Sequence, residues 1–128
     1  MNNNKKETQL LYIQMYGSIL FIITIIVSTI LTYNNIKKNN NEKRIFSEYT
    51  ENEINLTNRI VITILVIIFT YINYCFYQIN KQKNKSNLSK QELIASILTL
   101  ISGFILLNTT IKSIENNTNN INTNTPIF

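Results

Sequence analysis

The sequence predicts an all-α integral membrane protein, a small bundle of three transmembrane helices at about residues 9–36, 51–80 and 90–114. The prediction rests on charge and length. Three stretches contain no residue that is charged at neutral pH: Thr8–Ile36, Ile60–Asn80 and Leu93–Ile111. Because a helix rises about 1.5 Å per residue, roughly 20 residues cross the ~30 Å hydrocarbon core, and each stretch meets that requirement.

A soluble three-helix bundle is the competing interpretation. Its helices would need a polar face that bears charges every few turns. The run ILFIITIIVSTIL in the first stretch and the run VITILVIIFTYINYCFY in the second have no such face. The pattern therefore favours helices surrounded by lipid.

The first apolar run also follows a basic start at Lys5 and Lys6, as a secretory signal peptide does. A cleavable signal has an apolar core of only about 7–15 residues, followed by small residues at a cleavage site. Here the run is longer and ends in Thr32, Tyr33 and Asn34. We therefore expect an uncleaved first transmembrane helix.

Two capping boxes predict where the second and third helices begin. In this motif a Ser or Thr side chain and a Glu three residues later bond each other's backbone amides. Thr50 with Glu53 predicts a start near residue 51, and Ser89 with Glu92 predicts a start near residue 90. The second box stands at the expected membrane surface, and the helix that begins at the first box is expected to extend about two turns beyond the bilayer before Arg59.

These boundaries give a single three-helix domain at residues 1–115, with connectors at 34–50 and 81–89. The first connector is interpreted as a solvated linker. The alternative is a short helix on the membrane surface, since Ile45, Phe46 and Tyr49 fall on one helical face. Residues 116–128 are rich in Asn and Thr, which predicts a disordered tail.

Localisation and orientation follow from the basic residues. The cell membrane is the expected location. Three crossings put the N-terminus and the second connector on one side, and the tally of Lys and Arg is tied between the two sides. The second connector concentrates four lysines in a short loop, whereas the basic residues of the first connector alternate with glutamates. This difference favours a cytoplasmic N-terminus.

Small and polar residues inside the spans are the candidates for helix packing. Small residues let helix backbones approach closely in lipid, and hydroxyl or amide groups can bond across the contact. The candidates are Gln14, Gly17, Thr24, Ser28, Asn73, Ala95, Thr99 and Gly103. Asn73 is expected to make an interhelical hydrogen bond. The same faces could instead pack between copies or line a polar pore, and packing is favoured because the stripes carry no charge.

Missing residue types exclude most enzymatic chemistry. The chain has no His and no Asp, and Cys75 is its only cysteine. These absences remove His-based acid–base catalysis, Ser-His triads and Cys-rich metal centres. Every Glu lies outside the charge-free stretches, so no buried carboxylate is available to couple protons to transport. We therefore predict no catalytic, cofactor-binding or metal-binding residue and no small-molecule substrate.

The expected role is that of a small, non-enzymatic structural or accessory membrane protein. Its predicted partners are the lipid bilayer and either a further copy of the chain or another membrane protein. Nucleic acid is not expected, because the basic residues flank the membrane spans. The alternative is a self-assembling, pore-forming protein of the holin type, with the hydroxyl stripe that contains Thr24 and Ser28 facing the lumen.

Overall fold

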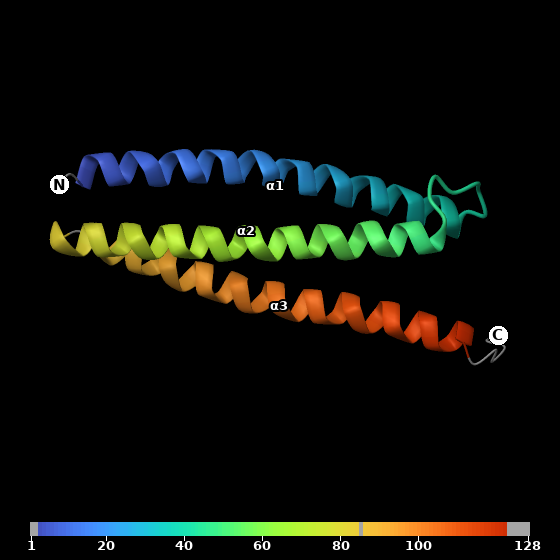
Figure 1. The fold of residues 1–128 in the computed structure, drawn as a ribbon. Helices are drawn as coiled ribbons and strands as arrows, with labels where there is room; N and C mark the ends of the chain where they lie inside the picture. The colour runs from blue at the N-terminus through green and yellow to red at the C-terminus, as the bar shows by residue number, and fades with distance from the viewer. Residues whose placement is uncertain (1–2, 85, 123–128) are drawn as a thin grey trace.

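The computed structural model describes the backbone of residues 3–84 and 86–122, and the side chains of residues 4–84 and 86–116. It contains three long helices: α1 (Asn3–Asn39), α2 (Glu48–Gln82) and α3 (Ser86–Asn122). Successive helices run antiparallel along one common direction, with one connector at each end of the molecule (Figure 1). The predicted all-α bundle of three transmembrane helices is confirmed.

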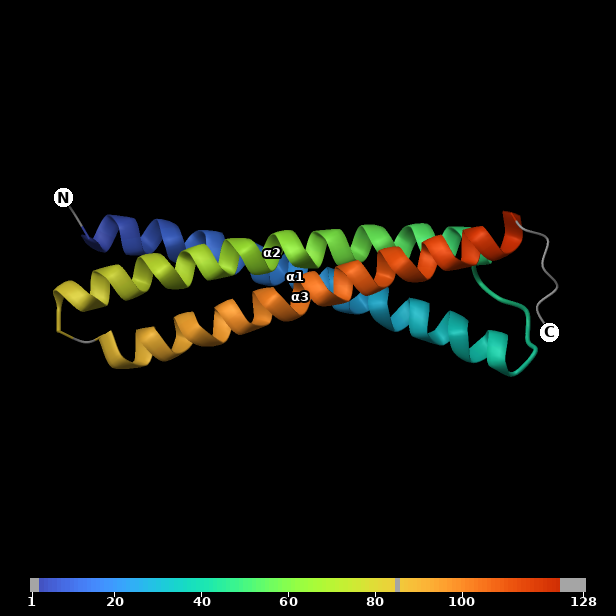
Figure 2. The same ribbon diagram turned by 90° about the horizontal axis from the view of Figure 1, so that it is seen from below.

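α2 is the central helix. α1 and α3 each pack on α2, and within the described part of the chain they do not pack on each other. Figure 2 shows the same arrangement from below, with α1 and α3 crossing α2 at different slopes. The bundle is therefore open along its sides, and its central helix carries both contacts.

Most of the apolar surface of these helices faces outward. In the apolar windows of α1, α2 and α3, only 17%, 28% and 0% of the positions are buried inside the chain. Large side chains such as Leu98 and Ile105 are 62% and 60% exposed. A surface this apolar is stable in lipid, where no hydrophobic force acts between helices, so it agrees with three membrane spans.

Both predicted capping boxes are wrong. α2 begins one turn earlier than expected, because Ser47 is its N-cap and its Oγ accepts a bond from the amide of Thr50 at 3.3 Å. Thr50 is therefore already inside the helix. Ser89 lies in the first turns of α3, and its hydroxyl is buried against α2, where it accepts a bond from the Asn80 amide.

α1 ends in a left-handed turn that its sequence explains. Asn41 has a φ of 59°, a conformation that asparagine tolerates better than most residues. The amide of Glu42 bonds the Lys37 carbonyl at 2.8 Å, and that of Asn41 bonds the Lys38 carbonyl at 3.2 Å. This is the Schellman arrangement, which satisfies the last carbonyls of the helix. Asn84, with a φ of 58°, stands just after α2 in the same conformation.

The connectors are shorter than predicted, because all three helices extend into them. Residues 40–47 join α1 to α2 without helix, so this segment is a linker and not a surface helix, and its solvation stays a prediction. α3 runs to Asn122, past the predicted start of the tail at residue 116. Residues 123–128 lie outside the described residues, and disorder there stays a prediction.

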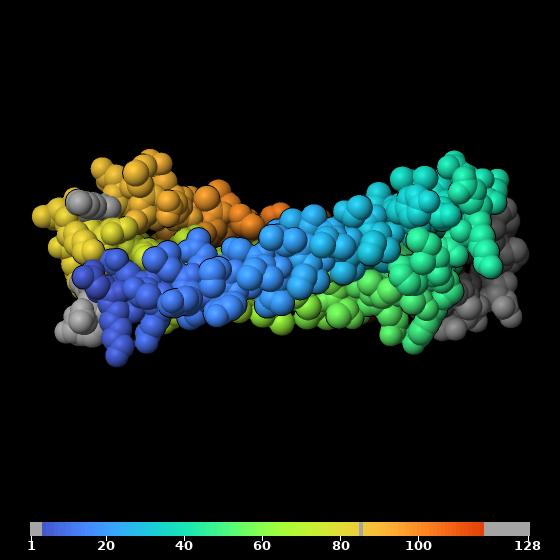
Figure 3. All heavy atoms as spheres, turned by 90° about the horizontal axis from the view of Figure 1, so that it is seen from above, coloured from blue at the N-terminus to red at the C-terminus, as the bar shows by residue number. Residues whose placement is uncertain are grey.

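α1 and α2 approach each other closely at Gly17. A Cβ placed on Gly17 would lie 3.0 Å from two ring atoms of Phe69. One turn further on, the rings of Phe21 and Phe69 meet with their centroids 6.4 Å apart. Figure 3 shows α1 lying obliquely across α2. Toward the N-terminus of α1, Leu10 joins a small core cluster around Ile72, which is only 1% exposed.

α3 packs on α2 through a seam with alternating steps of three and four residues. Every position of the seam is buried or half-buried: Ser89, Leu93, Ser96, Leu100, Gly103, Leu107, Thr110 and Ile114. Such spacing keeps one stripe of a helix facing its partner along a left-handed crossing.

Candidate functional site

The position of each side chain along the bundle can be estimated from the charges that flank the helices. Lys83 and Glu7 form an ion pair of 2.9 Å at the end of the molecule where α1 begins and α2 ends. From this level, Gln14 lies roughly 10 Å along α1 and Asn73 roughly 15 Å along α2, by the rise of each helix. Both residues lie inside the charge-free stretches of their helices, and within hydrocarbon an unmet hydrogen bond is costly.

At this depth a groove with polar walls runs along α2 between α1 and α3. It has a volume of about 470 Å³. We name it the polar groove and define it by six side chains from all three helices: Gln14, Thr70, Asn73, Glu92, Ser96 and Thr99. Aromatic and aliphatic groups of Phe21, Val66 and Phe69 form its inner end.

One bond across the polar groove joins α2 to α3. The Asn73 amide donates to the hydroxyl of Ser96. The Thr70 hydroxyl bonds the Val66 carbonyl of its own helix at 2.8 Å and also approaches the Ser96 carbonyl at 3.4 Å. The floor of the groove is therefore fixed by bonds inside the chain.

The wall from α1 is different. Gln14 is exposed, and its side chain has no hydrogen-bond partner among the side chains that the structure describes. The Thr99 hydroxyl is also exposed and bonds only the Ala95 carbonyl of its own helix, at 2.9 Å. Both walls thus present polar atoms to whatever fills the groove.

Glu92 marks the outer end of the polar groove. Its exposed carboxylate lines both the polar groove and an adjoining hollow that also contains Asn80 and Ser89. No ion pair within 4 Å involves Glu92 among the described side chains. The groove therefore runs from the Glu92 carboxylate, past amides and hydroxyls, to an apolar inner end.

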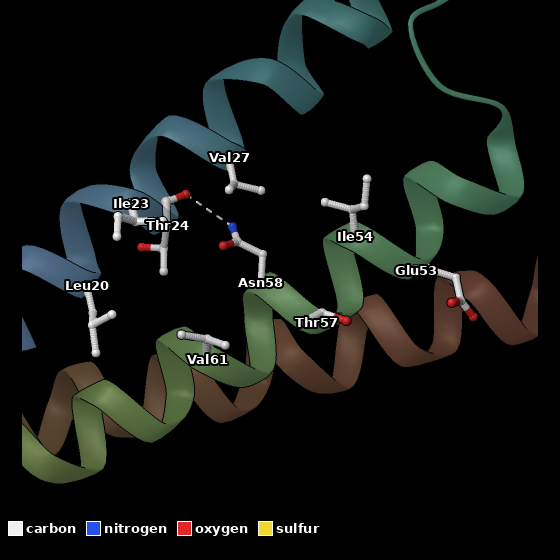
Figure 4. Close-up of a pocket in the computed structure, with 9 residues that line it drawn as sticks. All are labelled: Leu20, Ile23, Thr24, Val27, Glu53, Ile54, Thr57, Asn58 and Val61. Carbon is white, nitrogen blue, oxygen red and sulfur yellow. Dashed lines mark hydrogen bonds between the residues drawn. The ribbon is translucent and has the colours of Figure 1, made fainter.

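A second groove lies on α1 and α2 alone, toward the other end of the molecule. Asn58 of α2 is 7% exposed, and its amide donates to the Thr24 carbonyl at 3.2 Å and to the Ser28 hydroxyl at 3.0 Å. Figure 4 shows this crossing bond with the side chains around it. The second groove has a volume of about 440 Å³.

The structure distributes the predicted packing residues over these places. Four of them line the polar groove: Gln14, Asn73, Ala95 and Thr99. Thr24 and Ser28 face α2 and meet Asn58, and Gly17 meets Phe69. A Cβ placed on Gly103 would meet nothing within 4 Å, so Gly103 makes no close approach.

Two asparagines with central roles were not among the predicted candidates. Asn34 is fully buried, and it bonds both the first connector and Glu51. Asn58 ties α2 to α1.

The chemistry available in the polar groove is hydrogen bonding. Amides and hydroxyls act as both donors and acceptors, and Glu92 adds one negative charge. In the part of the chain that the structure describes, no three His, Cys, Asp or Glu side chains come together as metal ligands would.

The fold and the polar groove are those of a membrane protein that has three candidate spans and a groove with exposed polar groups. Comparison with known protein families, with curated proteins and with solved structures found no match for this chain.

Proposed function

We propose that this chain is a non-enzymatic membrane protein that associates through its polar groove with another transmembrane helix. That helix comes from a second copy or from another membrane protein. One observation carries the proposal: amide and hydroxyl groups of three different helices line one groove and remain open to the side.

Lipid tails are a poor match for the groove. They offer no donor or acceptor, so contact with them leaves the Gln14 amide unsatisfied at a depth where water is scarce. A neighbouring helix with its own amide or hydroxyl satisfies that group. In bilayers such bonds contribute about 0.6 kcal/mol on average, with a maximum near 1.7.

The groove also has the form that helix association favours. Ala95 and Thr99 are exposed on the wall from α3, where their small side chains let a further backbone approach closely. The interior bonds are already made by Asn73 and Ser96, so a docking helix meets a preformed floor.

Replacing Gln14 with leucine is expected to weaken association by about three- to tenfold, because one intermolecular hydrogen bond is lost. The fold should persist, since the Gln14 side chain makes no described bond inside the chain. The measurement is the yield of cross-linked complexes in membranes of cells that express the protein, as a function of expression level.

Asn108→Leu is the matched control, because it removes an equally exposed amide from the opposite flank of α3. It should leave the yield unchanged. A wild-type chain that gives only monomer, or equal losses for both variants, would refute association through the polar groove.

The groove also favours a second function, a pore made of several copies. Its polar walls and the carboxylate of Glu92 at the mouth are features of a cation-accessible lumen. In this arrangement the polar groove lines the lumen. The predicted lumen face of α1 does not, because Thr24 and Ser28 pack on α2. Prompt collapse of the membrane potential with dye entry on expression supports the pore, and an intact potential with verified insertion supports the packing role.

For localisation we propose the cell membrane with the N-terminus in the cytoplasm. The end of the molecule that holds the N-terminus and the second connector has six lysines and two glutamates in the sequence. The other end has six basic residues and five glutamates. The second connector concentrates four of these lysines in a short loop, which suits the cytoplasmic face.

A further inference from the structure

The second groove combines an apolar interior with a single carboxylate at its rim. Five aliphatic side chains of α1 and α2 line it: Leu20, Ile23, Val27, Ile54 and Val61. Thr57 and Asn58 add polar atoms to the lining, and Glu53 lies at the outer end of the groove (Figure 4). We name this space the apolar groove.

The polarity of the apolar groove changes with depth. Val61 and Leu20 lie inside the charge-free stretches of their helices, whereas Glu53 precedes the charge-free stretch of α2. Glu53 is roughly 8 Å further along the helix axis than Asn58. The headgroup region adds about 5–8 Å to each side of the hydrocarbon, so Glu53 stands at headgroup level when Asn58 stands at the hydrocarbon edge.

The order of these groups along the groove matches the order of groups in one phospholipid molecule, from its acyl tail to its headgroup. The aliphatic side chains match an acyl chain, the hydroxyl of Thr57 can donate to an ester carbonyl, and Glu53 offers a negative charge to the headgroup. Figure 4 shows the Glu53 carboxylate turned outward at the rim, away from the apolar side chains.

The charge at the rim selects among headgroups. Glu53 is the only ionisable side chain in the lining of the apolar groove. Tyr49, one turn before it, is exposed on the same helix. A carboxylate beside an aromatic ring suits an ammonium group and repels an anionic headgroup.

From this geometry we infer that the apolar groove binds one phospholipid with a primary ammonium headgroup, the acyl chain between α1 and α2 and the ammonium on Glu53. The primary ammonium donates hydrogen bonds to the carboxylate, which a quaternary ammonium does not. The site lies on the opposite side of the bilayer from the mouth of the polar groove, and it is independent of the association proposed above.

Native mass spectrometry of the purified chain tests the inference. The probes are phosphatidylethanolamine and phosphatidylglycerol with identical acyl chains. Phosphatidylethanolamine should bind as one molecule per chain and about three- to tenfold more tightly. Glu53→Gln should bring the two lipids to within about twofold of each other, because it removes the charge and keeps the shape.

Glu48→Gln is the matched control, since Glu48 is exposed on the same helix outside the apolar groove, and it should retain the preference. Val27→Trp fills the groove and should weaken both lipids, with unchanged helical content as evidence of folding. Equal binding of the two lipids by the wild-type chain, a preference for phosphatidylglycerol, or a preference that survives Glu53→Gln would each overturn the inference.

Discussion

Replacing Asn34 with alanine is expected to lower the free energy of unfolding by about 2–3 kcal/mol, because several bonds of one buried side chain are lost together. Asn34 is 0% exposed. Its Oδ1 accepts from the amides of Ile45 and Phe46 at 2.9 and 3.0 Å, and its Nδ2 donates to Glu51. This residue therefore fastens the first connector and the start of α2 to the end of α1. The measurement is unfolding by denaturing detergent in mixed micelles.

Asn35→Ala is the control, because Asn35 is the exposed neighbour on the same helix. It should change the stability by less than about 0.5 kcal/mol. A loss for Asn34→Ala no larger than that for Asn35→Ala would show that the connector is not held by this side chain.

Asn34→Asp adds a dependence on pH. The new carboxylate would face Glu51 in place of the amide that now donates to it, so the variant should be less stable than the wild type at neutral pH. Protonation removes the repulsion between two carboxylates, so the deficit should shrink as the pH falls. A deficit that stays constant with pH would contradict the contact with Glu51.

Replacing Gly17 with leucine is expected to lower the free energy of unfolding by about 2 kcal/mol, through overpacking against Phe69. Even a Cβ at this position would lie 3.0 Å from the Phe69 ring, so the larger side chain must push α1 away from α2. The ring contact between Phe21 and Phe69 would be lost with it. Two measurements test this prediction: the free energy of unfolding, which should fall, and the distance between labels on α1 and α2, which should increase.

Gly103→Leu is the matched control for this variant. Both changes gain the same helix propensity, roughly 0.8 kcal/mol, but a Cβ at Gly103 meets nothing within 4 Å. Gly103→Leu should therefore leave the stability unchanged or raise it by up to about 1 kcal/mol. Similar losses for both variants would mean that close approach at Gly17 is not what joins α1 to α2.

The three helices and their order could be predicted because the evidence for them is local. A charge-free run of bilayer length needs no partner to be identified. The helix ends were less predictable. Ser89 has the sequence of a cap, but its hydroxyl is buried at the contact with Asn80, so a tertiary bond decided its place.

The faces of the helices were only partly predictable. The ladder Ala95, Thr99 and Gly103 advances in steps of four, and each step turns about 40° beyond a full circle. The ladder therefore drifts from the wall of the polar groove at Ala95 to the seam with α2 at Gly103. Ser96, one residue away, makes the bond to Asn73. Sequence spacing alone does not show which face of a helix is turned toward its partner.

Asn58 and Asn34 escaped prediction for a related reason. Arg59 and Glu53 flank Asn58, so this part of α2 appears in the sequence as water-exposed helix. The charge-free stretch of α1 is longer than that of α2, and its end reaches the charged start of α2 across the bundle. Only the antiparallel pairing of the two helices brings these asparagines to their partners.

The central claim is that the polar groove is covered by protein in the membrane. The most direct test places a photo-crosslinking benzophenone amino acid at Ala95, in the wall of the groove, and separately at Ile97, on the opposite flank of α3. Irradiation of intact membranes should give protein adducts of defined mass from position 95 and lipid adducts from position 97. Lipid adducts alone from both positions would contradict the claim.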